Sequence, residues 1–268
     1  MKNVYIKKEI KCLCEIAKKA GKALLPIFRD NVQYSFKAGR ANVVTEADIL
    51  VEDMIRSELR RLFPGVPVVG EELADDAGIR DDIYFLIDPL DGTLNFLHGI
   101  PLFAVSIALV EKSYPKIGVV YAPALDETFC AADKCGSFLN NKLLRIRKSL
   151  SMEQALAATG WPYDPQLLEW AKRALLIVQP KVQEVRILGA ASLEMCYVAA
   201  EFLDIYWEIG LAPWDIAAGW LVLKEAGGFV IDVNGSDFNL ISGRILAGVS
   251  ETLCREIVSI FVDAGLGV

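Results

Sequence analysis

The sequence contains one histidine in 268 residues, His98, and this scarcity narrows the chemistry that the protein can support. A metal site built from several histidines is excluded, and a catalytic triad that depends on histidine is not expected. The six cysteines form no Cys-x-x-Cys pair and show no regular spacing, so we expect neither a zinc site nor a disulfide framework. We expect His98 itself to be structural, and any chemistry to depend on carboxylates.

Long hydrophobic runs are also absent, although 53% of the residues are hydrophobic and the mean hydropathy is +0.35. The longest candidate, residues 100–110, is about half of the roughly 20 residues that a membrane-spanning helix needs. Lysines interrupt the amino-terminal segment and leave no apolar stretch for a secretory signal. We therefore expect a cytoplasmic protein with no membrane partner. The net charge of −7 argues against nonspecific binding to nucleic acid, although acidic residues can gather around metal ions.

Hydrophobic periodicity predicts most of the secondary structure. Helices are expected over residues 6–27 with an end near 29–31, and over 45–63, 165–178, 190–200, 213–226 and 251–264. Two short strands are expected within 34–44, and further strands at 66–69, 83–87, 104–110, 116–121, 128–132, 155–158, 202–209, 229–231 and 245–249. The pattern divides into an α+β half with a mixed-sheet meander, residues 1–145, and an alternating α/β half, residues 146–268.

The most informative stretch is residues 83–96, where an apolar run leads directly into two aspartates. Pro89 cannot donate a hydrogen bond to a sheet, so we expect the strand to stop where the carboxylates begin. Asp88 and Asp91 would then lie in a turn at its carboxyl end, where open α/β sheets place their ligand sites. Mg²⁺ prefers oxygen ligands, and the carbonyl of Leu90 could add one. This stretch therefore predicts a metal site.

The next two residues favour a phosphate close to that metal. Gly92 lets the backbone approach a ligand, and Thr93 looks like a helix start whose N–H groups could hold a phosphate. An ordinary turn is one alternative, because Asp, Pro and Gly are common turn residues. The Asp-x-Asp-Gly-Thr motif of haloacid-dehalogenase phosphatases is another. It has one residue between its aspartates, whereas two intervene here, so the spacing argues against an aspartyl nucleophile.

A second pair of carboxylates lies in the other half of the chain. Residues 202–209 alternate between polar and apolar, which makes Glu208 the last polar residue of a strand. Pro213 fixes a helix start, and Asp215 lies in its first turn. Asp215 could simply complement the positive end of that helix, which is worth about 0.3–1 kcal/mol. A strand end and a helix start therefore each offer a carboxylate.

Taken together, residues 88–93 and the Trp-Asp-Ile-Ala-Ala-Gly segment at 214–219 resemble the two signatures of the inositol monophosphatase family. The similarity continues through residues 43–48, 70–72, 186–191 and 208–210, in the family's order. The resemblance implies a layered α/β/α/β/α sandwich of the type shared with fructose-1,6-bisphosphatase. It also implies a homodimer and a Mg²⁺-dependent, Li⁺-sensitive phosphatase of small phosphorylated polyols or sugars.

The resemblance further implies a set of site residues and two or three Mg²⁺ ions. The metal ligands would be Glu71, Asp88, the carbonyl of Leu90, Asp91 and Asp215. The catalytic residues would be Glu71, Thr93 and Asp48, with Thr93 hydrogen-bonded to Asp48 and orienting a water that attacks the phosphate. Substrate contacts would come from Asp91, Gly92, Thr93, Gly189, Ala190, Ala191, Glu208 and Asp215. No protein nucleophile is required.

Some of these residues have plainer interpretations. Asp48 also fits a capping box that begins at Thr45. Glu72 could bind a ligand through water, or it could be a solvated neighbour of Glu71. Lys37 resembles a residue of the family's mobile arm near the metals, but any surface lysine would look the same.

The metal signatures do not separate the substrates that the family uses. Selectivity is expected around residues 161–163, Arg186, 189–191 and Glu208. The compact chain favours a small monophosphate, and we expect myo-inositol 1-phosphate. The alternatives are fructose 1,6-bisphosphate, alone or as a dual activity with a basic contact from Arg186 or residues 172–173, or another family substrate such as 3′-phosphoadenosine 5′-phosphate. A regulatory scaffold is the non-enzymatic alternative, but the chain retains every carboxylate of the set.

Overall fold

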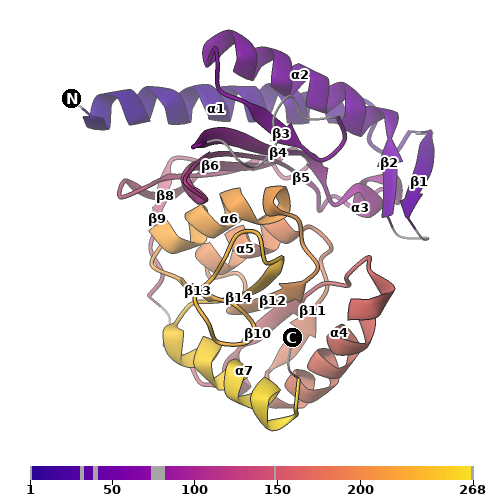
Figure 1. Ribbon diagram of the computed structural model, residues 1–268, viewed down its shortest axis with the longest axis vertical. Helices are drawn as coiled ribbons and strands as arrows, with labels where there is room; N and C mark the ends of the chain where they lie inside the picture. Colours follow the sequence, from indigo (N-terminus) through magenta and orange to yellow (C-terminus); the bar gives the residue numbers. More distant parts are fainter. Residues whose placement is uncertain (1, 31–32, 39–41, 74–81, 148, 267–268) are drawn as a thin grey trace.

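The computed structural model describes residues 2–30, 33–38, 42–73, 82–147 and 149–266. Five layers stack in the order helices, sheet, helices, sheet, helices (Figure 1). This arrangement confirms the predicted mixed α/β sandwich. Among the described residues, no helix combines the length and the apolar character needed to cross a membrane.

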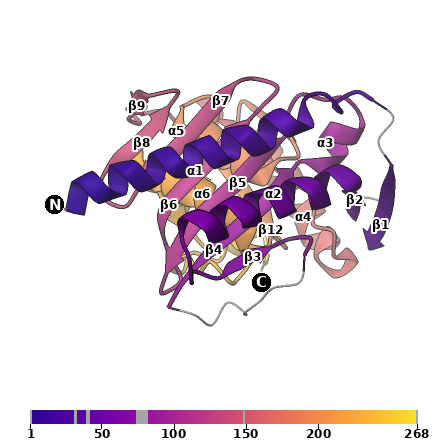
Figure 2. The same cartoon turned by 90° about the horizontal axis from the view of Figure 1, so that it is seen from above.

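The outermost amino-terminal layer consists of two long amphipathic helices, α1 (Lys2–Leu24) and α2 (Glu46–Leu62). They run side by side across one face of the first sheet (Figure 2). Between them the chain forms a separate hairpin, β1 (Tyr34–Ala38) and β2 (Asn42–Thr45), which lies near the short helix α3 (Thr93–Leu97). Helix α1 begins before the predicted start at residue 6 and ends before the predicted end near 29–31, and the two predicted strands within 34–44 are present.

The first sheet has seven strands in sequence order, and it is antiparallel except for its parallel first pair. Its strands are β3 (Val68–Gly70), β4 (Ile83–Asp91), β5 (Ala104–Glu111), β6 (Tyr114–Ala122), β7 (Glu127–Ala132), β8 (Gly136–Leu139) and β9 (Lys142–Leu144). From β5 to β9, successive antiparallel strands joined by short turns give the meander that the sequence predicts.

One predicted boundary in this sheet is wrong. The apolar strand does not stop before the carboxylates, because β4 continues to Asp91. Asp88 pairs with Ser106, and Asp91 pairs with Ala104, so one strand carries an extra residue between these pairs. Pro89 lies in this bulge, where its missing N–H breaks no ladder hydrogen bond. The bulge therefore keeps both aspartates within the strand and turns the chain beside them.

The second sheet has five strands in the order β11-β10-β12-β14-β13. Strands β11 and β12 run parallel to β10, whereas β14 runs antiparallel to its neighbours. The strands are β10 (Leu156–Thr159), β11 (Glu184–Arg186), β12 (Ile205–Ile209), β13 (Phe229–Ile231) and β14 (Arg244–Gly248). Short 3₁₀ turns at Met152–Gln154 and Gln179–Lys181 flank this region. The division of the chain at 145/146 stays a prediction.

Helices α5 (Ala191–Ala199) and α6 (Pro213–Glu225) form the middle layer between the two sheets, and α4 (Pro165–Val178) and α7 (Glu251–Asp263) cover the outer face of the second sheet (Figure 1). Residues 216–223 of α6 are all buried. This fits a helix that packs against β4–β7 on one side and β13 on the other. A helix covered on both sides is apolar around most of its circumference.

Candidate active site

Three carboxylates from separate elements meet at one end of the first sheet. Oxygen atoms of Glu71, Asp88 and Asp215 all lie within 4.8 Å of one another. Glu71 directly follows β3, and the parallel register pairs Gly70 with Ile87, so Glu71 and Asp88 leave neighbouring strands side by side. Asp215 arrives on the first turn of α6. The sheet register and one helix start therefore assemble the acidic cluster.

Ser106 connects α6 to this cluster. It lies directly across from Asp88 in the β4–β5 pair, and its hydroxyl donates to the carbonyl oxygen of Trp214 at 3.2 Å. The next residue is Asp215, whose Oδ2 accepts a hydrogen bond from the N–H of Ala212 at 2.7 Å. These contacts hold the start of α6 against β5, so the Asp215 carboxylate stays close to Asp88.

The electrostatics of the cluster fit a divalent cation. Asp88 is 2% exposed, and burial raises its pKa well above the usual range, with further increases from Glu71, Asp91 and Asp215. Burial, followed by Glu71 and Asp91, raises the pKa of Asp215 in the same direction. Carboxylates that repel one another in a buried place are stabilised by a hard cation, which prefers oxygen ligands. The donor set therefore suits a metal ion, and Glu71, Asp88 and Asp215 could hold it.

Asp91 differs from those three residues, because the structure brings it to α5. Its Oδ1 accepts from the N–H of Ala191 at 3.1 Å, and its Oδ2 accepts from the N–H and the hydroxyl of Ser192 at 2.8 and 2.5 Å. Asp91 thus caps the amino terminus of α5. The two hydrogen bonds from Ser192 use both lone pairs of Oδ2, so Oδ1 is the oxygen left for a metal ion. The metal-binding role of Asp91 stays a prediction.

A hydrogen-bonded chain of two threonines and one aspartate lies beside the cluster. Asp48 is buried, and its Oδ2 accepts hydrogen bonds from the N–H of Thr45 at 2.8 Å and from the Thr45 hydroxyl. The capping box is therefore real, but it uses only one oxygen of Asp48. The other oxygen, Oδ1, lies 3.1 Å from Thr93 Oγ1. Burial raises the pKa of Asp48 to about 6, although the hydrogen bonds from Thr45 and Thr93 lower it.

Thr93 Oγ1 also lies 2.9 Å from the carbonyl oxygen of Leu90. A hydroxyl has one proton, so it donates to Asp48 or to Leu90 at any moment. Gly92, with φ of 88°, precedes Thr93 and caps the short helix α3. A Cβ at Gly92 would lie 2.8 Å from the carbonyl oxygen of Leu102, so the turn requires glycine. The roles predicted for Gly92 and Thr93 toward phosphate stay predictions.

The side predicted to contact substrate is built on β12. Glu208 is 8% exposed, and its Oε2 accepts from the hydroxyl of Tyr206 at 2.6 Å. Burial raises the pKa of Glu208 to about 7. Tyr163 is 56% exposed, yet burial, and then Glu71, Asp215, Asp91 and Glu208, raise the pKa of its hydroxyl. Tyr163 is therefore near enough to the carboxylates of the site to be affected by their charge, and it belongs to the segment where selectivity is predicted.

The backbone at residues 189–191 is partly occupied by contacts within the protein. The N–H of Ala191 donates to Asp91, and that of Ala190 hydrogen-bonds the Glu194 carboxylate. Asn95 Nδ2 donates to the carbonyl oxygens of Leu188 and Leu102 at 2.6 and 2.7 Å and lies 3.5 Å from that of Gly189. The segment is thus held rigidly, and the substrate contacts predicted for Gly189, Ala190 and Ala191 stay predictions.

The basic residues considered from sequence lie in different places. Lys37 Nζ contacts Glu71 Oε1 at 2.7 Å and also Glu72, so the hairpin reaches the cluster. Burial lowers the pKa of Lys37, but the two glutamates outweigh this and the net pKa is raised. Arg186 is exposed and lies close to Glu184, whereas Arg173 donates to the carbonyl of Ala264 between α4 and α7. His98 is exposed at the end of α3, and its structural role stays a prediction.

A sequence model of the inositol monophosphatase family matches residues 6–265 of the chain. The chain belongs to the inositol monophosphatase family. An inositol-1-monophosphatase from Mesorhizobium japonicum is 40% identical over 92% of this chain and 93% of its own length. A fructose-1,6-bisphosphatase/inositol-1-monophosphatase from Thermotoga maritima is 38% identical over 81% of each. The solved structure of extragenic suppressor protein suhB from Bartonella henselae has a TM-score of 0.88 at 37% identity, covering 94% of this chain and 98% of that one.

Membership of the inositol monophosphatase family identifies the protein as an enzyme, a phosphoric monoester hydrolase. The prediction of a phosphatase is therefore confirmed, and so is the resemblance on which it rested. The acidic cluster is the part of this family member where metal-assisted chemistry could occur. The names of its relatives refer to different substrates, so the family alone does not identify the substrate of this enzyme.

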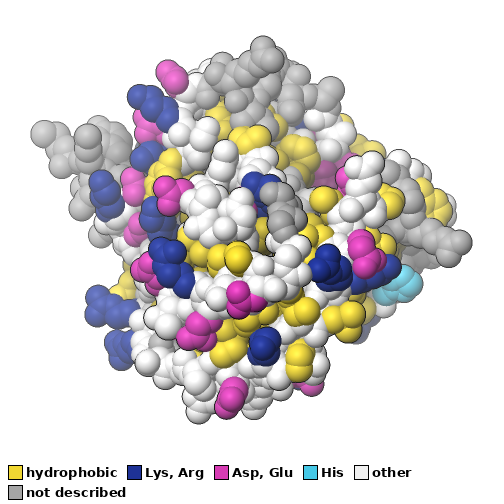
Figure 3. All heavy atoms as spheres, turned by 60° about the horizontal axis from the view of Figure 1, so that its bottom comes forward, with side chains coloured by type: hydrophobic (Ala, Val, Ile, Leu, Met, Phe, Trp, Pro, Cys, Tyr) yellow, Lys and Arg dark blue, Asp and Glu magenta, His cyan; other side chains and the backbone are white. Residues whose placement is uncertain are grey.

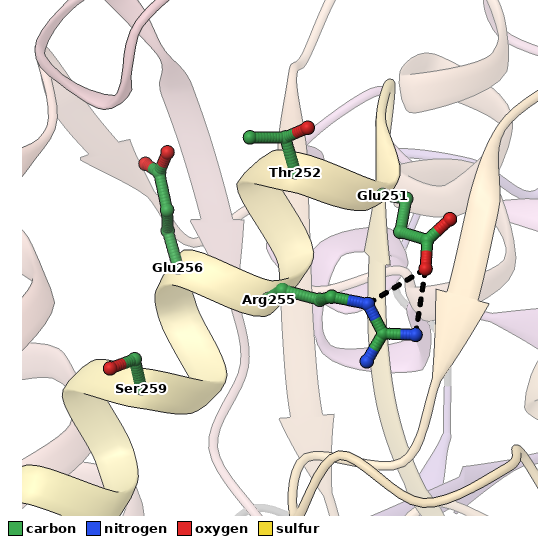
Figure 4. Close-up of a pocket in the computed structure, with 5 residues that line it drawn as sticks. All are labelled: Glu251, Thr252, Arg255, Glu256 and Ser259. Carbon is green, nitrogen blue, oxygen red and sulfur yellow. Dashed lines mark hydrogen bonds and ion pairs between the residues drawn. The ribbon is translucent and has the colours of Figure 1, made fainter.

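Other parts of the surface look unlike this site. A depression of about 480 Å³ lies along α7, lined by Glu251, Thr252, Arg255, Glu256 and Ser259 (Figure 4). Arg255 there donates to Glu251 Oε1 at 2.7 Å. On the face of the molecule drawn in Figure 3, acidic and basic side chains surround exposed hydrophobic ones without separating by sign. The depression contains none of the clustered carboxylates, so we place the active site at the acidic cluster.

Sequence reasoning missed several residues that shape the site: Glu52, Arg56, Asn95, Ser192, Glu194 and Tyr206. Some signals were present. Tyr206 shares a strand face with Glu208 in the predicted alternation, and Glu52 precedes Arg56 by four residues, the spacing of a helical ion pair. Ser192 gave no local signal, because its partner Asp91 is 101 residues away.

Proposed function

We propose that this enzyme is a Mg²⁺-dependent phosphomonoesterase of small polyol phosphates, converting myo-inositol 1-phosphate and water into myo-inositol and phosphate. The observation that carries the proposal is the meeting of Glu71, Asp88 and Asp215 next to the hydrogen-bonded pair Thr93 and Asp48. Carboxylates supply the oxygen ligands that Mg²⁺ prefers. The threonine and aspartate supply a hydroxyl and a base for a water molecule. These are the two parts that hydrolysis without a protein nucleophile requires.

The ligands of two or three Mg²⁺ ions would be Glu71, Asp88, the carbonyl of Leu90, Asp91 and Asp215. Bound divalent ions acidify water and neutralise charge that develops on a phosphate and its leaving group. The three clustered carboxylates fit this role because their mutual repulsion, expressed in the raised pKa values of Asp88 and Asp215, is offset by a cation. Asp91 would contribute while it also caps α5.

The proton of the attacking water would move along Thr93 and Asp48. Thr93 Oγ1 would accept a hydrogen bond from the water and donate its own proton toward Asp48 Oδ1. Asp48 Oδ2 is occupied by Thr45, so Oδ1 is the oxygen that receives the proton. The Leu90 carbonyl, the other neighbour of the Thr93 hydroxyl, belongs to the proposed metal ligands, which leaves Asp48 as the acceptor. A base positioned in this way contributes about 10²–10⁴ in rate.

The polyol would be held by the carboxyl-terminal half of the chain. The Glu208 carboxylate, fixed by Tyr206, would accept a hydrogen bond from a ring hydroxyl. The same ring would contact the backbone of Gly189, Ala190 and Ala191. The phosphate would accept hydrogen bonds from the N–H groups of Gly92 and Thr93. Burial and the charge of the site's carboxylates raise the pKa of Tyr163, and Tyr163 would close one side of this space.

The test is phosphate release from a panel of phosphate esters with Mg²⁺, with and without Li⁺. We expect release from myo-inositol 1-phosphate, inhibition by Li⁺ and dependence on added Mg²⁺. The Asp91→Asn variant should lose this activity, whereas Asp133→Asn, on a partly exposed ion pair with Lys116, should keep it. If the wild-type enzyme releases no more phosphate than Asp91→Asn from any ester, the proposal fails.

A second candidate is a dual activity that includes fructose 1,6-bisphosphate. The Thermotoga maritima relative carries both activities in its name, which favours including this ester in the panel. A bisphosphate needs an added basic contact. Arg186, which is exposed at the end of β11, is the candidate, so Arg186→Gln should reduce hydrolysis of the bisphosphate and spare the monophosphate.

We also propose a cytoplasmic homodimer without nucleic-acid or membrane partners, on the resemblance and the net charge of −7. Light scattering of the purified enzyme measures the oligomeric state. The structural neighbour from Bartonella henselae is named as a suppressor protein, which supports a regulatory role in addition to the enzymatic one.

A further inference from the structure

Helix α2 places a buried ion pair beside the segment that carries Glu71. Glu52 and Arg56 lie one turn apart, and they are 0% and 2% exposed. Arg56 Nε donates to Glu52 Oε1 at 2.7 Å. A buried ion pair is costly unless hydrogen bonds satisfy the rest of each charged group. The contacts made by the other polar atoms of this pair therefore indicate its role.

The other hydrogen bonds of this pair within the described residues go to the backbone on both sides of Glu71. Glu52 Oε2 accepts from the N–H of Glu72 at 2.8 Å, and Glu52 Oε1 accepts from the N–H of Leu73 at 3.1 Å. Arg56 Nη1 donates to the carbonyl oxygen of Val68 at 2.8 Å, and Nη2 donates to that of Leu73 at 3.0 Å. The pair thus holds the chain before and after the proposed metal ligand.

Gly70, immediately before Glu71, fits against the same carboxylate. A Cβ at Gly70 would lie 2.7 Å from the carboxyl carbon of Glu52. Real side chains do not approach so closely, so the residue next to the ligand must be glycine for Glu52 to reach the backbone. The glycine therefore leaves the space that the Glu52 carboxylate needs to hydrogen-bond the backbone beside Glu71.

The sheet cannot provide this restraint alone. Strand β3 has three residues and, among the described strands, pairs only with β4, and its last ladder pair is Gly70 with Ile87. This pairing ends one residue before Glu71. Residues 71–73 have no strand or helix assignment, and in the described part of the chain hydrogen bonds from α2 hold the backbone of Glu72 and Leu73. A ligand on such a segment needs support from other residues to keep its position.

We propose that Glu52 and Arg56 are positioning residues that fix the Glu71 carboxylate in the acidic cluster and so set the affinity of the cluster for its divalent cation. This inference rests on the proposed function, because it takes Glu71 as a metal ligand. The described contacts of both residues go to the backbone of residues 68–73, and that makes a measurement of metal binding more informative than a measurement of rate.

The test is binding of Mn²⁺ alone to the purified full-length enzyme, without substrate, followed by electron paramagnetic resonance of the free ion. Glu52→Gln keeps the shape of the side chain but puts an NH₂ group where an oxygen now accepts a backbone N–H. We expect its dissociation constant for Mn²⁺ to rise about tenfold, the lower end of what loss of a supporting hydrogen bond costs a metal site.

Glu58→Gln is the matched control. Glu58 lies on the same helix, but its carboxylate pairs with Lys19 and Arg61 at 2.5 and 2.7 Å, away from Glu71. We expect this variant to bind Mn²⁺ as the wild type does. Thermal unfolding of both variants separates a loss of stability from a loss of affinity. A pair with a purely structural role would lower the melting temperature and leave the dissociation constant unchanged, and that result would overturn the proposal.

Two further measurements cover the case in which Glu52→Gln does not fold. The double variant Glu52→Gln/Arg56→Met removes both charges and leaves none buried alone; wild-type affinity in this variant would also refute the proposal. In the wild type, hydrogen exchange at the amides of Glu72 and Leu73 should be slow although they lie outside the sheet, and rapid exchange would contradict the inference. A wild type that binds no Mn²⁺ and releases no phosphate would instead refute the proposed function itself.

Discussion

Ser192 donates both its N–H and its hydroxyl to the same oxygen of Asp91, at 2.8 and 2.5 Å. The contact joins β4 of the first sheet to the first turn of α5 and is buried on both sides. Hydrogen bonds to a charged group contribute about 1.5–3 kcal/mol when they are buried. The orientation of a proposed metal ligand therefore depends on a residue from the other half of the chain.

Replacing Ser192 with alanine removes the hydroxyl and keeps the N–H. We expect Ser192→Ala to lower the free energy of unfolding by about 1.5–3 kcal/mol and to raise the Mg²⁺ concentration needed for half-maximal activity. Urea unfolding and a Mg²⁺ titration measure the two effects. Ser259→Ala, on the exposed face of α7, should change neither. An unchanged unfolding free energy in Ser192→Ala would show that the hydroxyl contact is not formed in solution.

The Thr93 hydroxyl is predicted to transfer a proton, so its loss should affect turnover and not metal binding. Thr93→Val keeps the branched shape and removes the hydroxyl, and we expect kcat to fall by about 10²–10⁴, the usual contribution of a positioned acid or base. Thr93→Ser should recover most of the rate because it restores the hydroxyl opposite Asp48. Steady-state kinetics at saturating Mg²⁺ measure this, and a Val variant with near-wild-type kcat would remove Thr93 from the mechanism.

Tyr206 is predicted to affect substrate binding through Glu208. Tyr206→Phe removes the hydroxyl that donates to Glu208 Oε2, which frees the carboxylate to rotate. We expect KM for a polyol phosphate to rise about tenfold, equivalent to about 1.4 kcal/mol, with kcat little changed. A phosphate ester without free hydroxyl groups should show no such change in KM. An equal effect on both esters would mean that Tyr206 supports the fold and not the recognition of hydroxyls.

The buried carboxyl group of Glu194 predicts how stability depends on pH. Burial, followed by Glu208, raises its pKa well above the usual range although Leu188 and Ala190 donate to it, and Oε2 has no partner among the described residues. The folded protein therefore holds the proton of this carboxyl group more tightly than the unfolded chain does. Unfolding then releases a proton above about pH 4.5, so stability should fall as pH rises, by at most about 1.4 kcal/mol per unit. The loss ends at the folded-state pKa.

Glu194→Gln keeps the oxygen that accepts from the N–H of Leu188 but does not titrate. We expect this variant to be more stable than the wild type at pH 8 and similar to it near pH 4.5. Urea unfolding across this range gives the comparison. Parallel pH profiles for the two proteins would mean that Glu194 stays ionised in the folded state.

The sequence predicted the parts of the site that depend on local order. The spacing of Asp88 and Asp91 and the position of Asp215 after Pro213 are visible in single segments. The boundary of β4 was predicted wrongly, because a proline normally ends a strand and only the pairing with β5 shows that a bulge accommodates it. The proximity of Asp215 to Asp88 required tertiary packing, through Ser106 and Trp214.

Buried support for the site was harder to predict than the site itself. Glu52 and Arg56 look like a surface ion pair on a helix, and nothing in α2 shows that the backbone around Glu71 packs over them. Asn95 and Glu194 similarly act on the peptide of Leu188 from different elements. Hydrogen bonds between distant segments leave no periodic pattern in the sequence, which is why these residues emerged only from the structure.

The middle layer of helices determines whether either half of the chain could fold by itself. Helix α6 packs on β4–β7 and on β13, so a fragment cut between residues 144 and 156 would expose one wall of that helix to water. Such fragments should aggregate when expressed separately and regain solubility only when produced together. The packing of α6 on the first sheet also brings Asp215 to Asp88 and Glu71. Phosphatase activity of the mixed fragments would therefore show that they had recombined.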